Sequence, residues 1–433
     1  MKKILIWRQI TAHNELDIFS QTDYSAIFNQ CKAIFGKGVC PNWGNKLWFQ
    51  GLYSEINTGE NEIVFRSNES IEEINERYDL IVYPMANFFS IEHSAGMPEL
   101  AKLFLQIRIP VYVIACGAQA DTYDDLDKLV EQIGEPSKQF IAAIYQTGGE
   151  FALRGYFTKA FFDKLGFPSA VVTGCPSMYQ LGSDFRMCED KKEILSLKPV
   201  VNGKVRYVKE ILKKYPQSVL MDQEVYFSCL FDPEYFQSLG SLKSRILFHE
   251  YLNSYSAALL KDNRIKMIAD MGNWFTYLQY EGFNYSIGNR IHGNIMSILA
   301  GIPATVLAHD TRTREMAEFF EIPLHLVSKN ETLSVRDFER LYINADYSKF
   351  NATYRSKYNA YVDFLKKYGI VSRINEKNEF FSQADKRHDF EMFTVNCEKF
   401  GELESWFKPR MPVIQAGCAV LELKNRKKRM QKE

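Results

Sequence analysis

The sequence predicts an α/β protein with two doubly wound, Rossmann-like domains that face each other across a cleft. Short, almost continuously apolar runs alternate with amphipathic helical patterns, which is typical of buried parallel sheets. A charged stretch interrupts this alternation once, and the alternation then resumes. The length of 433 residues also suits two or three domains.

Residues 1–185 make up the first predicted domain. Its expected strands and helices follow one another as KILIW, 46–56, YDLIVYP, 97–107, PVYVIACG, 138–145, FALRG, 158–165 and SAVVTG. Chain-breaking residues such as Pro84 and Gly117 stand at or just beyond the apolar runs, where strands are expected to end.

A linker is expected over residues 186–214, which are charged and show no apolar periodicity. The second domain, 215–346, is predicted to comprise SVLMDQEVYF, 241–260, RIKMIAD, 274–280, FNYSIG, 291–299, PATVLAH, 314–320 and LHLVS. Residues 347–433 are predicted to form a C-terminal extension, with a helix over 347–368 that crosses back onto the first domain. The extension ends in a basic run, 424–432, interpreted as a solvated tail or, alternatively, as a contact for an anionic membrane.

The composition narrows the range of partners and locations. Fifty-three basic residues balance 53 acidic ones, so the chain lacks the positive field on which nucleic-acid binding depends. The 8 cysteines form no CxxC pair or Cys/His cluster, which predicts reduced thiols and no metal site. Arg8 and His13 interrupt the N-terminal apolar run before a signal peptide could be completed. We therefore expect a cytoplasmic protein.

The segment 286–323 contains the strongest candidate site. A strand ends at Gly288 and a helix begins near Ile291, so Asn289, Arg290 and His292 fall at a strand-to-helix turn. Such turns lie at the carboxyl ends of parallel strands, where helix N-termini offer backbone N–H groups to anions. The next strand leads into a second polar and cationic turn, which contains His309, Asp310 and Arg312.

Each of these residues also has a purely structural interpretation. Arg290 could pair with a neighbouring acid, Asp310 could neutralise Arg312, and His292 could be a buried core histidine. In the first domain, Arg154 is placed at a further strand-to-helix turn, while Ser177 and Asn45 lie in loops near strand ends or helix starts. Cys175 is interpreted as a packed thiol.

Together, the motifs over 42–323 resemble the polysaccharide pyruvyltransferase family. They are NWGN, VIACGAQA, ALRGYFT, TGCPS, the helix at Trp274, and GNRIHGN followed by GIPATVLAHDTRTRE. The resemblance implies a fold similar to GT-B glycosyltransferases and phosphoenolpyruvate as donor, with no cofactor or metal. The expected product is a pyruvate ketal across two hydroxyls of a sugar in an exopolysaccharide, capsule or cell-wall glycan, or in a lipid-linked precursor.

The resemblance also assigns roles to residues. It implies donor binding by Arg154, Arg290, Ile291 and His292, with His292 as the catalytic group. The side chains expected to orient these groups or to touch substrate are Asn289, His309, Asp310, Arg312, Asn45 and Ser177. One position departs from the family, since many members carry an acidic residue where this chain has Gly155.

The implied donor suits these residue types, because guanidinium groups pair well with carboxylate and phosphate. Arg154 and Arg290 are expected to hold it from opposite domains. Two other hypotheses remain open. One is a GT-B-type glycosyltransferase that uses a nucleotide-sugar, and the other is a non-catalytic sugar- or anion-binding protein of a polysaccharide assembly complex.

Overall fold

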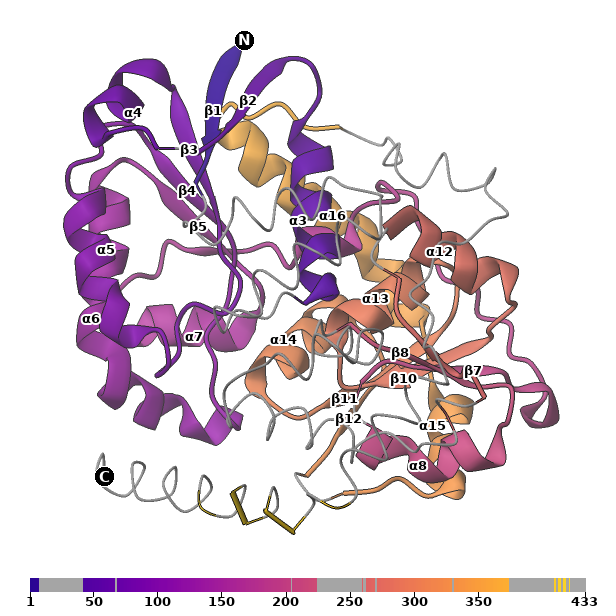
Figure 1. Cartoon of the computed structure of the whole chain (residues 1–433). Coiled ribbons are helices and arrows are strands. Elements are labelled where there is room, and N and C mark those ends of the chain that lie inside the picture. The colour runs from indigo at the N-terminus through magenta and orange to yellow at the C-terminus, as the bar shows by residue number, and fades with distance from the viewer. Residues whose placement is uncertain are drawn as a thin grey trace.

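The fold consists of two parallel sheets of six strands each, with helices packed against both (Figure 1). The computed structural model describes residues 1–7, 42–66, 68–203, 205–223, 259, 262–268, 271–328 and 331–373, and positions 409, 412–413, 416–417 and 420. Every strand pairing in these residues is parallel. The predicted α/β fold class is therefore confirmed.

The first sheet has the strand order β2-β1-β3-β4-β5-β6. Its strands are β1 (Lys2–Ile6), β2 (Asn61–Phe65), β3 (Leu80–Pro84), β4 (Val111–Cys116), β5 (Glu150–Leu153) and β6 (Val171–Val172). The helices of this half are α3 (Trp43–Ile56), α4 (Ile71–Arg77), α5 (Met97–Phe104), α6 (Leu126–Gln146) and α7 (Tyr156–Lys164).

Both faces of this sheet are buried, which explains the continuous apolar strands. Ile4 and Ile6 belong to a core cluster that includes residues of α3, whereas Leu5 and Trp7 belong to a second cluster with residues of α5 and α6. Because successive strand side chains point to opposite faces, helices on both sides bury every position of the inner strands β3, β4 and β5, whereas the edge strands β2 and β6 are partly exposed.

The second sheet has the order β12-β11-β10-β7-β8-β9. Its strands are β7 (Pro199–Val201), β8 (Val219–Met221), β9 (Ile265–Lys266), β10 (Tyr285–Gly288), β11 (Ala304–Ala308) and β12 (Leu324–Leu326). The helices that follow are α8 (Val205–Lys214), α12 (Met271–Tyr280), α13 (Ile291–Leu299), α14 (Thr311–Phe320), α15 (Val335–Asn344) and α16 (Ser348–Lys367).

The predicted linker over 186–214 is wrong in its second half. β7 pairs with both β10 and β8, so it lies inside the second sheet, and α8 follows it directly. The helix is amphipathic: Tyr207, Val208, Ile211 and Leu212 are buried, while the charged residues between them hide this spacing in the sequence. The second domain therefore begins before residue 215. The predicted helix over 241–260 falls outside the described residues, except for position 259.

Helix α16 crosses back onto the first domain, as predicted (Figure 1). The Tyr358 hydroxyl lies 3.3 Å from Oε1 of Glu55, and just beyond the helix the Tyr368 carbonyl accepts a hydrogen bond from Nζ of Lys2 at 2.8 Å. In the described part of the chain, no helix combines the length and apolar character needed to cross a bilayer. The basic run at 424–432 lies outside the described residues, and its membrane contact stays a prediction.

A stacked tyrosine pair gives a matched test of how α16 is anchored. The rings of Tyr179 and Tyr361 stack at 5.3 Å, and the Tyr179 hydroxyl donates to the Thr173 carbonyl at 2.6 Å. The buried Tyr361 hydroxyl has no hydrogen-bond partner among the described residues. Tyr179→Phe should therefore lower the free energy of unfolding by about 1–3 kcal/mol, whereas Tyr361→Phe should be neutral or stabilising. Urea unfolding midpoints measure both, and equal losses would contradict this account.

Candidate active site

The carboxyl ends of the two sheets meet, and three predicted side chains come together there. Arg154 follows β5 of the first sheet, His292 lies in the first turn of α13 after β10, and Arg312 lies in the first turn of α14 after β11. Both guanidinium charges act on the imidazole of His292. Strand-end turns of both domains therefore lie close together, while their role as one binding site stays a prediction.

The turn between β10 and α13 is fixed by a residue that the sequence analysis did not single out. Asn294 donates from Nδ2 to the Gly288 carbonyl at 2.8 Å and accepts from the Ser286 hydroxyl at 2.9 Å. Arg290 is the N-cap residue of α13, and its backbone N–H donates to the Asn202 carbonyl at 3.0 Å. The first turn of α13 is thereby held at the edge of the sheet.

His292 is buried, with only 8% of its surface exposed. Burial, Arg154 and Arg312 together lower its pKa to about 3, so the imidazole is neutral near neutral pH. The Cys175 sulfur lies 3.9 Å from Nε2 and accepts a hydrogen bond from the Ser177 hydroxyl at 3.1 Å. Burial raises the pKa of the Cys175 thiol, which is consistent with a packed thiol.

The start of helix α3 closes the other side of His292. A Cβ atom on Gly44 would lie 2.9 Å from the His292 Cβ atom, so this close approach requires glycine. Asn42 caps α3 by accepting the Gly44 N–H at 2.8 Å. Asn45 is half-buried in the first turn of the same helix, and its N–H donates to the Asn42 carbonyl.

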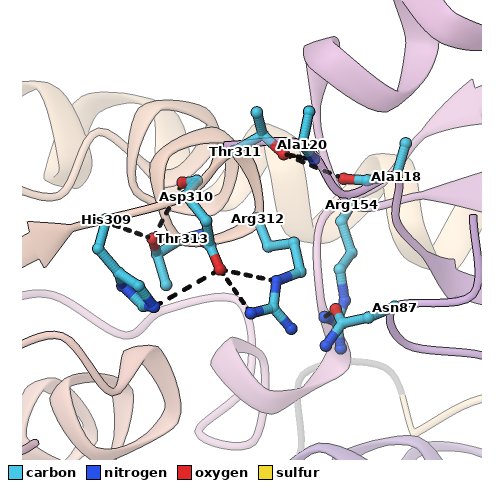
Figure 2. A network of polar contacts seen from close by, with 9 residues as sticks. All are labelled: Asn87, Ala118, Ala120, Arg154, His309, Asp310, Thr311, Arg312 and Thr313. Atoms are coloured by element: carbon cyan, nitrogen blue, oxygen red, sulfur yellow. Dashed lines mark hydrogen bonds and ion pairs between the residues drawn. The ribbon is translucent and has the colours of Figure 1, made fainter. Parts of the chain in front are cut away.

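Arg154 is a buried cation with donors to spare. Its side chain is 2% exposed, and Nη1 donates to Oδ1 of Asn87 at 2.9 Å (Figure 2). Its Nε and Nη2 atoms have no hydrogen-bond partner in the described ranges of the chain. A buried guanidinium with unused donors is suited to binding an anion.

The turn before α14 carries a charge network (Figure 2). Asp310 caps this helix by accepting the Thr313 N–H at 3.0 Å, and it also accepts from Nε of Arg312 at 2.9 Å. Nε2 of His309 lies 3.6 Å from the same carboxylate. Although burial raises the pKa of Asp310, Arg312 and His309 hold it below its usual value. Asp310 therefore orients Arg312, which was one of the structural alternatives.

Two further contacts join α14 to the first domain. The backbone N–H of Ala120 donates to the Thr311 hydroxyl at 3.0 Å, and the Thr311 N–H donates back to the Ala120 carbonyl at 3.2 Å (Figure 2). Deeper in the interface, the Glu315 carboxyl accepts from the backbone N–H of Thr158 at 2.9 Å. Glu315 and Asn87 were not predicted from the sequence. Glu315 lies inside α14, and Asn87 follows β3 but belongs to no motif that indicates a role.

The remaining predicted residues lie around this cluster. Arg290 and Ile291 are half-buried, and Ile291 packs against the main core. Asn289 is buried against Gly203. The charges that act on His292 are those of Arg154 and Arg312, whereas the pairing of Arg154 with Arg290 around a donor stays a prediction.

Comparison with known proteins points to one family. The family model described as polysaccharide pyruvyl transferase matches residues 19–311, which is more than half of the chain. Among curated protein sequences, none matches significantly.

Comparison with solved structures gives matches at low identity. A putative UDP-N-acetylglucosamine 2-epimerase from Listeria monocytogenes is 11% identical over 76% of this chain and 95% of its own, with a TM-score of 0.40. The S. aureus MnaA–UDP co-structure is 11% identical over 85% and 97%, with a TM-score of 0.41. The glycosyltransferase SnogD from Streptomyces nogalater is 12% identical over 79% of both chains, with a TM-score of 0.29. The fold class itself rests on the two sheets.

Two of the buried titratable groups of the site, Glu315 and His292, have opposite effects on stability as pH changes. Burial raises the pKa of Glu315 from 4.5 to about 8, so between these values the folded state binds more protons and stability falls as pH rises. The pKa of His292 is lowered from 6.5 to about 3, so between these values stability falls as pH decreases. Above pH 6.5 the contribution of His292 levels off, and Glu315 dominates the change in stability.

We therefore predict a loss of stability between pH 6.5 and 8 that depends on Glu315. The free energy of unfolding should fall by up to about 2 kcal/mol across this interval, since each pH unit corresponds to about 1.4 kcal/mol for one proton. Glu315→Gln should flatten the slope, whatever its effect on absolute stability. Urea midpoints at pH 6.5, 7.25 and 8 measure the slope, and parallel curves for the two proteins would contradict the prediction.

Proposed function

Because the chain belongs to the polysaccharide pyruvyl transferase family, we propose that it transfers the enolpyruvyl group of phosphoenolpyruvate to a sugar and closes it to a pyruvate ketal. The observation that carries this proposal is the buried Arg154 guanidinium, which has unused donors beside a neutral His292 at the start of a helix. This arrangement combines an anion site with a group that can transfer a proton.

The donor would bring a carboxylate and a phosphate to this site. Arg154 and the N-terminal N–H groups of α13 offer hydrogen-bond donors to such an anion, and Arg312 adds a second guanidinium from the other domain. Arg290, at the N-cap of α13, is proposed to bind the donor from the same turn. A bound anion would offset the charges of Arg154 and Arg312, which raises the pKa of His292. Donor binding would thus charge the catalytic acid.

The proposed reaction begins with proton transfer from His292 to the methylene carbon of phosphoenolpyruvate. The central carbon becomes cationic, and a sugar hydroxyl adds to it while His292 accepts the hydroxyl proton. A second hydroxyl of the sugar then forms a bond to the same carbon as the C–O bond to phosphate breaks, and its proton leaves with the phosphate. The products are the cyclic ketal and inorganic phosphate.

Ligand-dependent melting distinguishes this proposal from a nucleotide-sugar transferase. A ligand that binds only the folded state raises the melting temperature by mass action. We expect phosphoenolpyruvate at saturating concentration to raise it, and UDP- or GDP-sugars to have little effect. The reverse pattern would favour the glycosyltransferase, while binding of phosphoenolpyruvate without turnover on any glycan would favour the non-catalytic alternative.

Substitutions separate donor binding from proton transfer. Arg154→Lys keeps the charge but loses the planar fork, so donor binding should weaken by about 1.5–3 kcal/mol. His292→Gln cannot transfer a proton, so phosphate release with the acceptor glycan should fall about 10²–10⁴-fold while donor affinity changes little. Calorimetric titration and phosphate release measure the two effects, and both variants should melt near the wild type. If the His292→Gln variant turns over as fast as the wild type, His292 is not the catalytic acid. The acid would then have to be His309 or Asp310.

A further inference from the structure

Helix α7, which directly follows Arg154, has no N-terminal cap from its own segment of the chain. Its N-cap residue is Gly155, which makes no side-chain hydrogen bond. The third residue of the helix is Thr158, whose side chain is completely buried, so its backbone N–H needs a partner inside the protein. In most helices, the side chain of an N-cap Ser, Thr, Asp or Asn accepts the hydrogen bond from such an N–H group.

Glu315 of α14 supplies the missing acceptor from the other domain. Its Oε2 atom accepts the Thr158 N–H at 2.9 Å, and its Oε1 atom accepts the Thr158 hydroxyl at 2.9 Å. The same hydroxyl accepts the Ala118 N–H at 2.8 Å, so the loop after β4 is tied into the arrangement. Glu315 is 1% exposed, and its contacts therefore depend on α14 lying against the first domain.

Gly155 provides the space that Glu315 occupies. A Cβ atom at position 155 would lie 2.8 Å from the Cβ atom and 2.9 Å from Oε2 of Glu315. The backbone at Gly155 is extended, with φ −171° and ψ −176°, so other residues can adopt this conformation. Glu315 therefore prevents a side chain at position 155. A capping side chain at position 155 and the Glu315 side chain cannot both be accommodated.

Glu315 also lies close to Arg154. A Cβ atom on Gly117 would lie 3.4 Å from Cδ of Arg154 and 3.5 Å from Oε1 of Glu315, so both side chains flank the same glycine. The guanidinium charge of Arg154 in turn acts on the Glu315 carboxyl. The start of α7, the Glu315 carboxyl and the stem of Arg154 thus form one packed unit.

We propose that Glu315 is a positioning residue that caps α7 from the second domain and thereby makes the placement of Arg154 depend on contact between the two domains. This inference rests on the proposed function for the identity of the donor. The capping geometry itself is independent of that identity.

Moving the cap to its own helix tests the proposal. The proteins to compare are the wild type, Glu315→Ala, Glu315→Gly, Gly155→Asp, and the double variant Gly155→Asp/Glu315→Gly. Glycine at 315 is needed in the double variant because it also removes the Glu315 Cβ atom, which would lie 2.8 Å from a Cβ atom at 155. Glu315→Ala should weaken phosphoenolpyruvate binding about 10-fold or more, and Gly155→Asp alone should also weaken it because the new side chain displaces Glu315. In the double variant the introduced aspartate can cap α7 within its own segment, so affinity should return to within about 3-fold of the wild type.

Glu318→Ala is the matched control. Glu318 lies on the same helix and also contacts the first domain, since its Oε2 atom accepts the Tyr123 hydroxyl at 2.7 Å. The Glu318→Ala substitution should leave the affinity for phosphoenolpyruvate near the wild-type value. If Glu318→Ala weakens binding as much as Glu315→Ala, or if the double variant is no better than the worse single variant, Glu315 acts only through general packing and the proposal fails.

A second readout does not involve phosphoenolpyruvate. Because the charge of Arg154 helps to lower the pKa of His292, displacement of Arg154 should raise that pKa. An NMR titration of the labelled His292 ring should therefore show a higher pKa in Glu315→Ala and recovery toward the wild-type value in the double variant. If the wild type does not bind phosphoenolpyruvate, the proposed function fails, while this titration still decides whether Glu315 positions Arg154. An unchanged pKa in Glu315→Ala would overturn the inference.

Discussion

The burial of one positive charge between two sheets constrains the rest of the site. Arg154 is 2% exposed and makes one side-chain hydrogen bond, to Asn87, among the described residues. Burying a charge costs free energy unless neighbouring groups compensate it, so the fold must hold the groups around Arg154 in place. The elements around the site are the apolar cluster that spans both domains, helix α16, and the turns at the starts of α13 and α14. Burial, this charge and that of Arg312 lower the pKa of His292, so Arg154 links the stability of the fold to the chemistry of the site.

Local patterns predicted the strand-to-helix turns well. The turn at 288–292 was predictable because strand, glycine and helix signals follow one another within a few residues, and α13 begins at Ile291 as expected. The start of the second domain was not predictable in the same way. β7 has only three residues, too few for a periodicity, and the charged residues of α8 mask the buried side chains between them.

The site was predictable only where each residue carries its own signal. Arg154, His292 and Arg312 each follow a strand, and parallel strands bring such positions to a common edge. Glu315 carries no such signal, because it lies inside α14 and its partner Thr158 belongs to a distant segment. Asn87 does follow β3, but its role depends on contact with Arg154, which lies far along the chain. The departure from the family at Gly155 becomes intelligible only in three dimensions, since Glu315 fills the space beside it.

The core has a consequence for the cooperativity of the molecule. One apolar cluster contains Ile4 and Val82 of the first sheet, Val200 and Val306 of the second, and Tyr358 of α16. The first half also has a cluster of its own, around Leu5 and Trp7, but a cut between the domains would still expose the apolar surface of the shared cluster on each half. The two domains, although separate in the sequence, are therefore not expected to unfold independently. Heat or denaturant should unfold both halves together, and a lesion in either half weakens the whole chain.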